Sequence, residues 1–335
     1  MGHIESVIVD ISCKMSIFAL MKYLSRILAL LAGLSFYGMV QAQEKLVFTP
    51  QWTAQAQFAG YYVAQELGFY KDAGIEVEIV HPSSTESALV RLQSGKSQLT
   101  TIQLCQAMEF IDNGIPLVNI LQTSMNNGLV IVSRNGKNPA GQKGIRVGTW
   151  SVGFDQIALA MCLKEDLDYQ WVRYATSINL FLAGAIDAIL AMSYNEYYLL
   201  KQCGVELTEE NTYRFRDHGY NVQEDGVYML ESNYRKNKEA AQKFAQASKR
   251  GWLYCAEHPE EALEIVMKYV RMHHVATNRV MQKLQLEEVL KLQIDPDSGE
   301  REFRLRPDMV KLANDLMLES QLLLSEVTYQ QIIAR

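Results

Sequence analysis

Residues 45–80 read KLVFTPQWTAQAQFAGYYVAQELGFYKDAGIEVEIV and carry a strand pattern, a helix pattern and a second strand pattern. Residues 45–49 are an apolar run that Pro50 ends, which predicts a buried strand. Over residues 58–74 the apolar residues recur at helical spacing, and a glycine ends the pattern. Residues 75–80 alternate between apolar and acidic side chains, which is typical of a strand. This order predicts two parallel strands joined by a crossover helix.

The same alternation continues along the chain and predicts an α/β fold with mostly parallel, doubly wound sheets. From residue 238 onward the pattern is mainly helical. We expect further strands at 99–104, 117–121, 128–133, 145–148, 170–173, 188–192 and 226–230. We expect further helices at 86–94, 107–113, 154–163, 178–183, 196–203, 238–257, 259–270, 278–292 and 307–324.

The chain is expected to form two lobes joined by two crossings. The polar, glycine-bearing stretch 134–141 predicts the first crossing, and we expect the second near residue 226. Residues 43–133 and 226–335 then form one lobe, and residues 134–225 form an inserted second lobe. Open α/β sheets bind ligands at the carboxyl ends of their strands, so the cleft between the lobes is the expected ligand site.

The N-terminal residues 1–42 predict an export signal. A short basic stretch precedes the apolar run ILALLAGLSFYGMV at 27–40, and small residues for a signal peptidase end at Ala42. We expect cleavage after Ala42 and a periplasmic mature chain, because the run is shorter than the roughly 20 residues of a membrane span. An uncleaved anchor is the alternative, and the choice between Met1 and Met21 as the start stays open.

The composition is that of an ordinary globular protein. The 335 residues carry a formal net charge of −6, with 48% hydrophobic and 21% charged residues, which excludes a disordered or collagen-like chain. An acidic chain lacks the basic face that a nucleic-acid binder needs. Five scattered cysteines with no CxxC pair argue against a zinc site or a disulfide scaffold, so we expect no metal site.

Three stretches carry a more specific pattern, and their order matters more than any one of them. They are QWTAQAQFAGYYVA at 51–64 leading into GFYKDAGI at 68–75, RLQSGK at 91–96, and GAIDA at 184–188 before Tyr194-Asn195-Glu196. Over about residues 45–260 the chain resembles the solute-binding proteins of ABC importers for nitrate, sulfonate, taurine and thiamine precursors. The fungal thiamine pyrimidine synthase is a member of the same family.

This resemblance implies a two-lobe type II periplasmic-binding-protein fold with two hinge crossings and a helical C-terminal region. It implies that the lobes close over a small ligand and present it to an ABC permease in the inner membrane. Trp52 and the later Asn195-Glu196 resemble the thiamine-pyrimidine branch, so the expected ligand is a thiamine pyrimidine precursor. A sulfonate, taurine or nitrate binder and a ligand sensor are alternatives. We expect a monomer that needs no cofactor.

The pyrimidine synthase of this family is a further alternative, and two positions argue against it. The enzyme resembles this chain around residues 94–96, after which it carries a Schiff-base lysine and, four residues on, a sacrificed histidine. Without gaps, those positions are Ile102 and Gln106 here. Isoleucine forms no imine with pyridoxal phosphate, and glutamine donates no imidazole. The enzyme's cysteine cluster is also missing from the sequence, so we expect a binding protein without catalytic residues.

Five candidate ligand-binding residues lie at or after the carboxyl ends of predicted strands, where we expect the cleft. Trp52 can stack on a flat ring, and Gln103 can hydrogen-bond a polar edge. Glu196 can accept a hydrogen bond from an exocyclic amine, although a glutamate in a first helical turn also favours the helix dipole. Tyr194 and Asn195 precede Glu196 in the same motif.

Five more residues complete the candidate set. Tyr61 and Tyr62 lie in the first turns of a helix, and we expect one to face the cleft and the other the sheet. Ser151 and Gly153 lie in a strand-to-helix loop whose N–H groups can hold a polar group, and the resemblance implies that this loop faces the ligand. Asn126 belongs first of all to a turn, with ligand contact as the alternative. An anionic ligand would need an arginine, and this set contains none.

Overall fold

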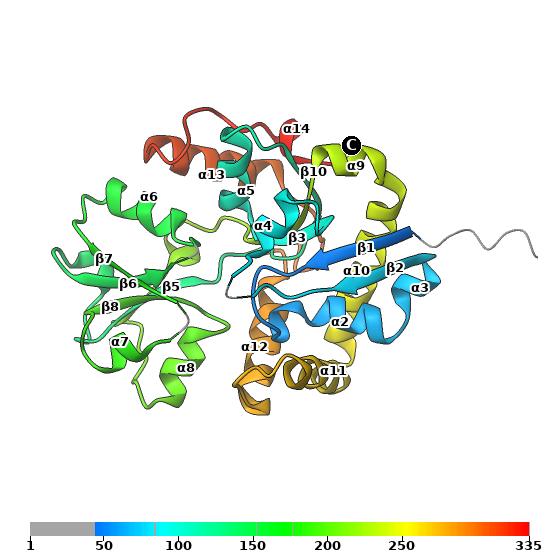
Figure 1. Cartoon of the computed structure of the whole chain (residues 1–335). Helices are drawn as coiled ribbons and strands as arrows, with labels where there is room; N and C mark the ends of the chain where they lie inside the picture. Colours follow the sequence, from blue (N-terminus) through cyan, green and yellow to red (C-terminus); the bar gives the residue numbers. More distant parts are fainter. Residues whose placement is uncertain (1–43, 84, 152, 176, 335) are drawn as a thin grey trace, which may run out of the picture. The chain divides into compact units, whose positions relative to one another are not determined.

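The computed structural model describes residues 44–83, 85–151, 153–175 and 177–334. In this part of the chain the predicted α/β class is confirmed, with two five-stranded sheets and helices packed on them (Figure 1). The predicted signal peptide at 1–42 lies outside the described residues. Within them, no helix is both long and apolar enough to span a bilayer.

The first sheet has the strand order β2-β1-β3-β10-β4. β1 runs parallel to β2 and β3, whereas β10 runs antiparallel to β3 and β4. Four of its five strands therefore point the same way, as the crossover pattern predicts. The strands are β1 (Glu44–Thr49), β2 (Ile75–Ile79), β3 (Leu99–Gln103), β4 (Leu117–Gln122) and β10 (Asp225–Leu230).

The second sheet repeats this arrangement in the order β7-β6-β8-β5-β9, coloured green in Figure 1. β6 runs parallel to β7 and β8, whereas β5 runs antiparallel to β8 and β9. The strands are β5 (Leu129–Ser133), β6 (Arg146–Trp150), β7 (Gln170–Tyr174), β8 (Ala188–Met192) and β9 (Thr212–Arg214).

The chain passes between the two sheets just before β5 and just before β10, the strands that run against their neighbours. One expected boundary is corrected here, because residues 129–133 pair with β8 and β9 of the second sheet instead of joining the first. The first crossing therefore lies at 123–128, and the polar stretch 134–141 is a turn beside the second sheet. A polar stretch marks a turn, but distant contacts decide which sheet the preceding strand joins.

Helices α2 (Ala59–Glu66) and α10 (Lys238–Glu257) approach each other closely beside the first sheet. A Cβ atom on Gly251 would lie 2.0 Å from the backbone oxygen of Gly60, so this approach requires glycine. The helix expected at 58–74 is divided in the structure. Gly68 adopts a left-handed φ of 76° between α2 and the short helix α3 (Phe69–Asp72).

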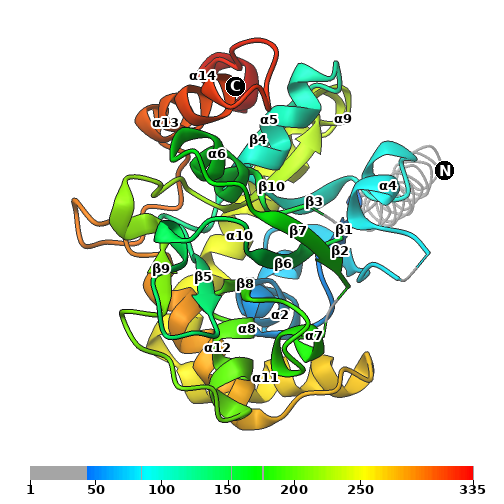
Figure 2. The same ribbon diagram turned by 90° about the vertical axis from the view of Figure 1, so that its left-hand side faces the viewer.

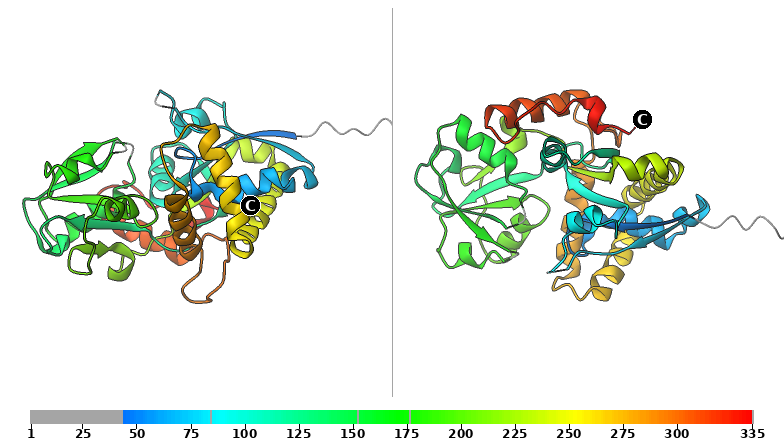
Figure 3. Two further views of the ribbon diagram at one scale, coloured as in Figure 1. Left: turned by 90° about the horizontal axis from the view of Figure 1, so that it is seen from below. Right: turned by 45° about the horizontal axis from the view of Figure 1, so that its top comes forward.

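The C-terminal helices contact helices that follow strands of the first sheet and helices that follow strands of the second sheet. Helix α12 packs on the 3-10 helix η1 and on α8, and α13 packs on α5 and α6 (Figures 2 and 3). The bounds are η1 (Ala56–Phe58), α4 (Ala88–Gln93), α5 (Leu104–Asp112), η2 (Pro139–Gly141), α6 (Gln156–Lys164), α7 (Asn179–Leu182), α8 (Glu196–Gln202), η3 (Phe215–His218), α9 (Glu231–Lys236), α11 (Pro259–Met272), α12 (Arg279–Leu292), α13 (Pro307–Glu319) and α14 (Tyr329–Ile332).

An aromatic cluster forms the core between β1, α2 and α10. The ring centroid of Phe48 lies 4.7 Å from that of Tyr61 and 5.2 Å from that of Phe244. Tyr61 also meets Trp252 edge-on at 5.7 Å. All four side chains are almost fully buried, and burying each large apolar side chain contributes roughly 1.5–3 kcal/mol. The helix that follows the first strand is therefore held firmly in place.

Candidate functional site

The two crossing segments, 123–128 and 219–224, are hydrogen-bonded to each other. Asn221 donates from Nδ2 to Asn126 Oδ1 at 3.1 Å, and its own Oδ1 accepts from the Asn127 N–H at 2.8 Å. Asn126 also donates to the carbonyl oxygen of Ile294 at 2.6 Å. This corrects the candidate set, because Asn126 holds the crossings together and does not line the pocket described below.

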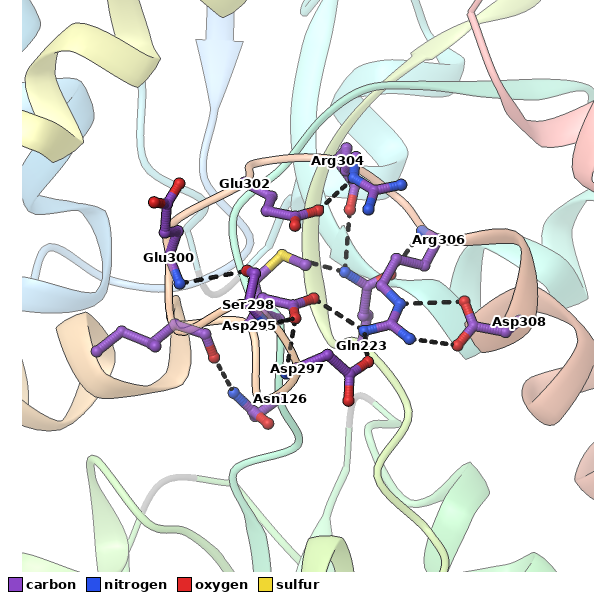
Figure 4. A network of polar contacts seen from close by, with 12 residues as sticks. Asn126, Gln223, Asp295, Asp297, Ser298, Glu300, Glu302, Arg304, Arg306 and Asp308 are labelled. Carbon is purple, nitrogen blue, oxygen red and sulfur yellow. Dashed lines mark hydrogen bonds and ion pairs between the residues drawn. The ribbon is translucent and has the colours of Figure 1, made fainter.

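A loop after α12 supports the crossings through the polar network of Figure 4. Gln223 donates to the carbonyl oxygen of Arg304 at 3.0 Å and accepts from the Arg306 N–H at 2.8 Å. The Arg306 guanidinium pairs with Asp295 at 2.9 Å and with Asp308 at 2.6 Å. These carboxylates raise the pKa of Arg306 well above its usual value, so the cation that organises the loop is permanent.

A pocket lies where strands of both sheets end. It encloses about 320 Å³ of empty space, part of which is open to solvent. Its walls come from the segment after β1, the end of β3, the end and following loop of β6, and the end and following turn of β8, as expected for open α/β sheets. The lining residues are Gln51, Trp52, Gln55, Gln57, Gln103, Trp150, Phe154, Met192, Tyr194, Asn195 and Glu196.

The structure brings five candidate residues together in this pocket: Trp52, Gln103, Tyr194, Asn195 and Glu196. They meet because each of them lies at, or a few residues after, the carboxyl end of a strand, and these ends converge at the pocket. Contact of these residues with a ligand stays a prediction.

Aromatic rings from both sheets meet at the pocket. The rings of Trp52 and Phe154 are 6.2 Å apart and nearly perpendicular, and Trp150 meets Phe154 in the same edge-on way at 6.2 Å. Phe154 has a φ of 81°, which is rare for a residue with a side chain and costs about 1–3 kcal/mol. Such strain is typical of functional loops, where the surrounding contacts hold a ring in place.

Four glutamines line the pocket, and three of them form a chain of amide hydrogen bonds behind it. Gln51 donates from Nε2 to Asp225 Oδ1 at 2.9 Å, and Gln57 donates from Nε2 to Asp225 Oδ2 at 2.6 Å. Gln57 also donates to the Tyr194 hydroxyl at 3.1 Å, and its Oε1 accepts from Gln55 at 2.6 Å. Their side chains are therefore fixed in orientation.

Two amide atoms of the pocket have no hydrogen-bond partner among the described residues. They are Gln51 Oε1 and Gln103 Nε2, and the Gln103 side chain is only 7% exposed. A buried amide group without a partner costs about 1–3 kcal/mol. One acceptor and one donor in the same pocket are therefore available to a polar ligand or to water.

Glu196 is a fixed carboxylate in the pocket wall. Its Oε1 accepts from the Trp150 indole at 3.2 Å and from Asn195 at 3.0 Å, and its Oε2 accepts from the Met192 N–H at 3.0 Å. Burial raises the pKa of Glu196, and these three donors oppose that rise. Among the described residues that line the pocket there is no lysine, arginine or histidine, so an anionic ligand would meet no positive charge.

The structure places Tyr61 and Tyr62 in the core, which corrects the expectation that one of them faces the cleft. Tyr61 belongs to the aromatic cluster beside α10, and Tyr62 stacks on Tyr269 with ring centroids 4.0 Å apart. The Tyr62 hydroxyl is hydrogen-bonded to His81 Nε2 at 2.8 Å. Helix α2 is covered by α10 and α11 as well as by the sheet, so both faces of its first turn are buried.

Ser151 and Gly153 lie beside the pocket and do not line it. The Ser151 hydroxyl donates to the carbonyl oxygen of Tyr174 at 3.0 Å, and the side chain is exposed. Gly153 has a φ of 93°, and a Cβ atom there would lie 3.4 Å from Gln106 Nε2. The residue of their loop that lines the pocket is Phe154, and contact of this loop with a ligand stays a prediction.

Sequence reasoning missed six lining residues: Gln51, Gln55, Gln57, Trp150, Phe154 and Met192. All six lie within stretches that the sequence had marked: close to Trp52, at the end of β6 or in the loop after it, or at the end of β8. The repeated glutamines at 51, 55 and 57 were an available signal of a polar site, because three side-chain amides so close together are unusual in an apolar core.

The two positions that distinguish the chain from the synthase are part of its packed structure. Ile102 is a buried residue of β3, and Gln106 lies in the first turn of α5. The cysteines that the structure describes are free thiols: Cys105, Cys162, Cys203 and Cys255.

Comparison with protein families identifies the family of the chain. A family model described as NMT1/THI5 like matches residues 55–262. The chain belongs to this family. The resemblance derived from the sequence is thereby confirmed, and the matched range holds the pocket residues from Gln55 to Glu196.

Curated relatives of the NMT1/THI5-like chain carry thiamine-related names. A Haemophilus influenzae protein named for thiamine biosynthesis is 25% identical over 74% of this chain and 81% of its own length. A formylaminopyrimidine-binding protein of Halalkalibacterium halodurans is 23% identical, covering 72% and 78%. An Aspergillus parasiticus 4-amino-5-hydroxymethyl-2-methylpyrimidine phosphate synthase is 24% identical, covering 72% and 74%.

Solved structures show the same fold. The periplasmic aliphatic sulphonate binding protein SsuA of Escherichia coli superposes with a TM-score of 0.61 at 15% identity, covering 88% of this chain and 93% of that one. The predicted periplasmic-binding-protein fold is thus confirmed, at an identity that speaks for the fold alone.

Proposed function

We propose that the protein is the exported solute-binding protein of an ABC importer and that it captures a thiamine pyrimidine precursor or a similar small heterocycle. The lining of the pocket carries this proposal. It has four aromatic side chains, four glutamine amides and one carboxylate, with no cationic side chain among the described lining residues. Aromatic faces accept a flat ring, and amides and a carboxylate pair with ring nitrogens and amino groups.

The name of one relative supports a ligand with a single ring. A relative that shares about three quarters of its length with this chain is named for binding formylaminopyrimidine, which is a ligand of this kind.

The charge of the pocket argues against the sulfonate, taurine and nitrate alternatives. An anion would lie beside Glu196 with no lysine, arginine or histidine in the described lining to pair with it. Burying a charge without a partner costs several kcal/mol. Similarity to a sulphonate-binding protein therefore supports the fold of this chain more than its ligand.

The chemistry at Ile102 and Gln106 argues against the synthase alternative. Neither side chain can form an imine or supply an imidazole, although one relative is named as a synthase. We therefore propose a binding protein without catalytic residues.

We propose that capture is a closing motion about the two crossing segments. Trp52 and Phe154 come from different sheets and approach each other over the pocket. Two hydrogen bonds also join the halves: Gln156 of α6 donates to Glu109 of α5 at 2.8 Å, and Gln57 donates to the Tyr194 hydroxyl at 3.1 Å. The closed form, as a periplasmic monomer cleaved after Ala42, is the species that we expect the permease to recognise.

A thermal-shift panel tests the proposal. It contains formylaminopyrimidine, 4-amino-5-hydroxymethyl-2-methylpyrimidine, thiamine, taurine, an alkyl sulfonate, nitrate and pyridoxal phosphate. A ligand at 100 times its Kd adds about 2.7 kcal/mol to the stability of the folded state, which raises the melting temperature measurably. We expect a shift with the pyrimidines alone. A shift with an anion or with pyridoxal phosphate would overturn the proposed ligand class.

Two tryptophan variants locate the binding. Trp52→Ala is expected to abolish the shift, because it removes a ring from the pocket wall. Trp171→Ala is the matched control, since Trp171 is a half-buried tryptophan of β7 that packs on Tyr169 outside the pocket. Equal loss of binding in both variants would show that the effect is one of folding.

A further inference from the structure

Asp225 lies behind the pocket, where the second crossing segment becomes β10. It lines an inner cavity that shares Gln57 and Tyr194 with the pocket, and it is not itself a lining residue of the pocket. Its backbone oxygen accepts from the N–H groups of Thr123 and Ser124 in the first crossing, at 2.9 and 3.0 Å. The position of Asp225 is therefore fixed by both crossings.

The carboxylate of Asp225 determines how two glutamine amides are turned. An ionised carboxylate only accepts hydrogen bonds, so each amide bonded to it must present its NH₂ group. Gln51 and Gln57 do so, at 2.9 and 2.6 Å. The oxygen of each amide must then point away from Asp225, whatever the ligand is.

The orientation is passed on from Gln57 to Gln55. The outward oxygen of Gln57 accepts from Gln55 Nε2 at 2.6 Å, which turns the Gln55 oxygen away from Gln57. Gln51 Oε1 is buried and has no partner among the described residues. Gln51 and Gln55 both line the pocket, and each has an amide oxygen, a hydrogen-bond acceptor, that these bonds leave unused.

Gln103, on the neighbouring strand β3, contributes a hydrogen-bond donor to the pocket instead of an acceptor. It lies directly across from Asp225 in the β3–β10 ladder, and its Nε2 is a buried donor without a partner in the described part of the chain. A ligand that satisfies the pocket has an amino group for the glutamine oxygens and a ring nitrogen for Gln103.

We propose that Asp225 is a positioning residue that sets the ligand specificity of the pocket by fixing its glutamine amides, so that the pocket accepts from an exocyclic amine. This inference rests on the proposed function and identifies the exocyclic amine as the ligand group that the pocket recognises. The neighbouring Glu224 supports it electrostatically: burial and the charge of Asp225 raise the pKa of Glu224 to about 8. Burial also raises the pKa of Asp225, and the hydrogen bonds from Gln57 and Gln51 oppose that rise, so these two donors favour the ionised, accepting carboxylate.

The test exchanges Asp225 for asparagine, which has the same shape but carries one acceptor and one donor. The oxygen of the new amide would still satisfy Gln57, which Tyr194 and Gln55 also hold. Its NH₂ group would force Gln51 to turn its oxygen inward. The pocket would then offer a donor where it had an acceptor.

Calorimetric titration compares 4-amino-5-hydroxymethyl-2-methylpyrimidine with its 4-oxo analogue. We expect the wild-type protein to prefer the amino compound by at least about tenfold, the effect of one unpaired buried polar group. In Asp225→Asn that preference is expected to fall by about tenfold. Glu224→Gln is the matched control, because it removes an acid at the adjacent position without touching either glutamine, and it should keep the preference. An equal change in both variants, or none in Asp225→Asn, would overturn the inference.

Two further measurements keep the inference testable if Asp225→Asn folds poorly or the wild type binds neither pyrimidine. Gln51→Met removes the same acceptor with Asp225 intact and should weaken the amino compound alone. The side-chain amide NMR signals of Gln51 report its orientation without any ligand. They should move in Asp225→Asn and stay in place in Glu224→Gln, and unmoved signals would refute the positioning role. A wild type that binds neither pyrimidine would refute the proposed function instead.

Discussion

Replacing Glu224 by glutamine is expected to remove one contribution by which the free energy of unfolding falls as the pH rises. Glu224 is only 4% exposed and lies where the second crossing meets β10. Burial, reinforced by the charge of Asp225, raises its pKa from 4.5 to about 8, and Arg216 opposes this rise. The folded protein thus keeps a proton over a pH range in which the unfolded chain has lost it.

The sign and size of the effect follow from this difference. Between pH 4.5 and pH 8 the folded state binds more protons than the unfolded state, so the free energy of unfolding falls as the pH rises. One such group changes it by about 1.4 kcal/mol per pH unit, or about 3 kcal/mol between pH 5 and pH 7. The contribution is fully present below pH 4.5 and is lost as the pH passes 8.

Urea unfolding at pH 5, 6 and 7 measures this effect as a difference between wild type and Glu224→Gln. Asp225 and Arg216, which face Glu224, are present in both proteins. Glu287→Gln is the control, because Glu287 is an exposed glutamate of α12 and its exchange should leave the slope of stability against pH unchanged. A Glu224→Gln protein whose stability falls with pH as steeply as that of wild type would refute the reasoning.

Three substitutions test other parts of the structure. Gly251→Ala should cost at least about 2 kcal/mol in urea unfolding, because its Cβ meets backbone, whereas Gly141→Ala has open space and should change stability by less than about 0.5 kcal/mol. Tyr62→Phe should lower the free energy of unfolding by about 1 kcal/mol, the value of one hydrogen bond, and leave the Kd for a pyrimidine unchanged. Weaker binding by this variant would show that Tyr62 takes part in the binding site. Trp150→Phe removes a donor to Glu196 and should weaken pyrimidine binding severalfold in calorimetry, and unchanged affinity would contradict the assigned role of that carboxylate.

The sequence predicts the fold and part of the site because both depend on local pattern. Strand and helix periodicity extends over short segments, and the ends of parallel strands converge wherever the sheets form. Trp52, Gln103 and Glu196 could be singled out because each one lies at the carboxyl end of a strand or within a few residues after it.

What the sequence did not predict depends on distant partners. The strand at 129–133 looks like its neighbours in sequence, but its partners in β8 and β9 place it in the second sheet. Tyr61 and Tyr62 have the pattern of a helix with one open face, and α10 and α11 cover it from almost 200 residues away. The role of Gln51 depends on Asp225, 174 positions further along the chain.

The loop that holds the crossings has a consequence for how proteins of this family can diverge. Arg306 and its partner carboxylates lie beyond residue 262, where the match to the family ends, whereas most of the pocket lies within the match. Changes in that loop can therefore alter the stiffness of the crossings while the pocket keeps its shape. Two descendants of one ancestor could then recognise the same compound yet retain it for very different times, each suited to the supply in its own habitat.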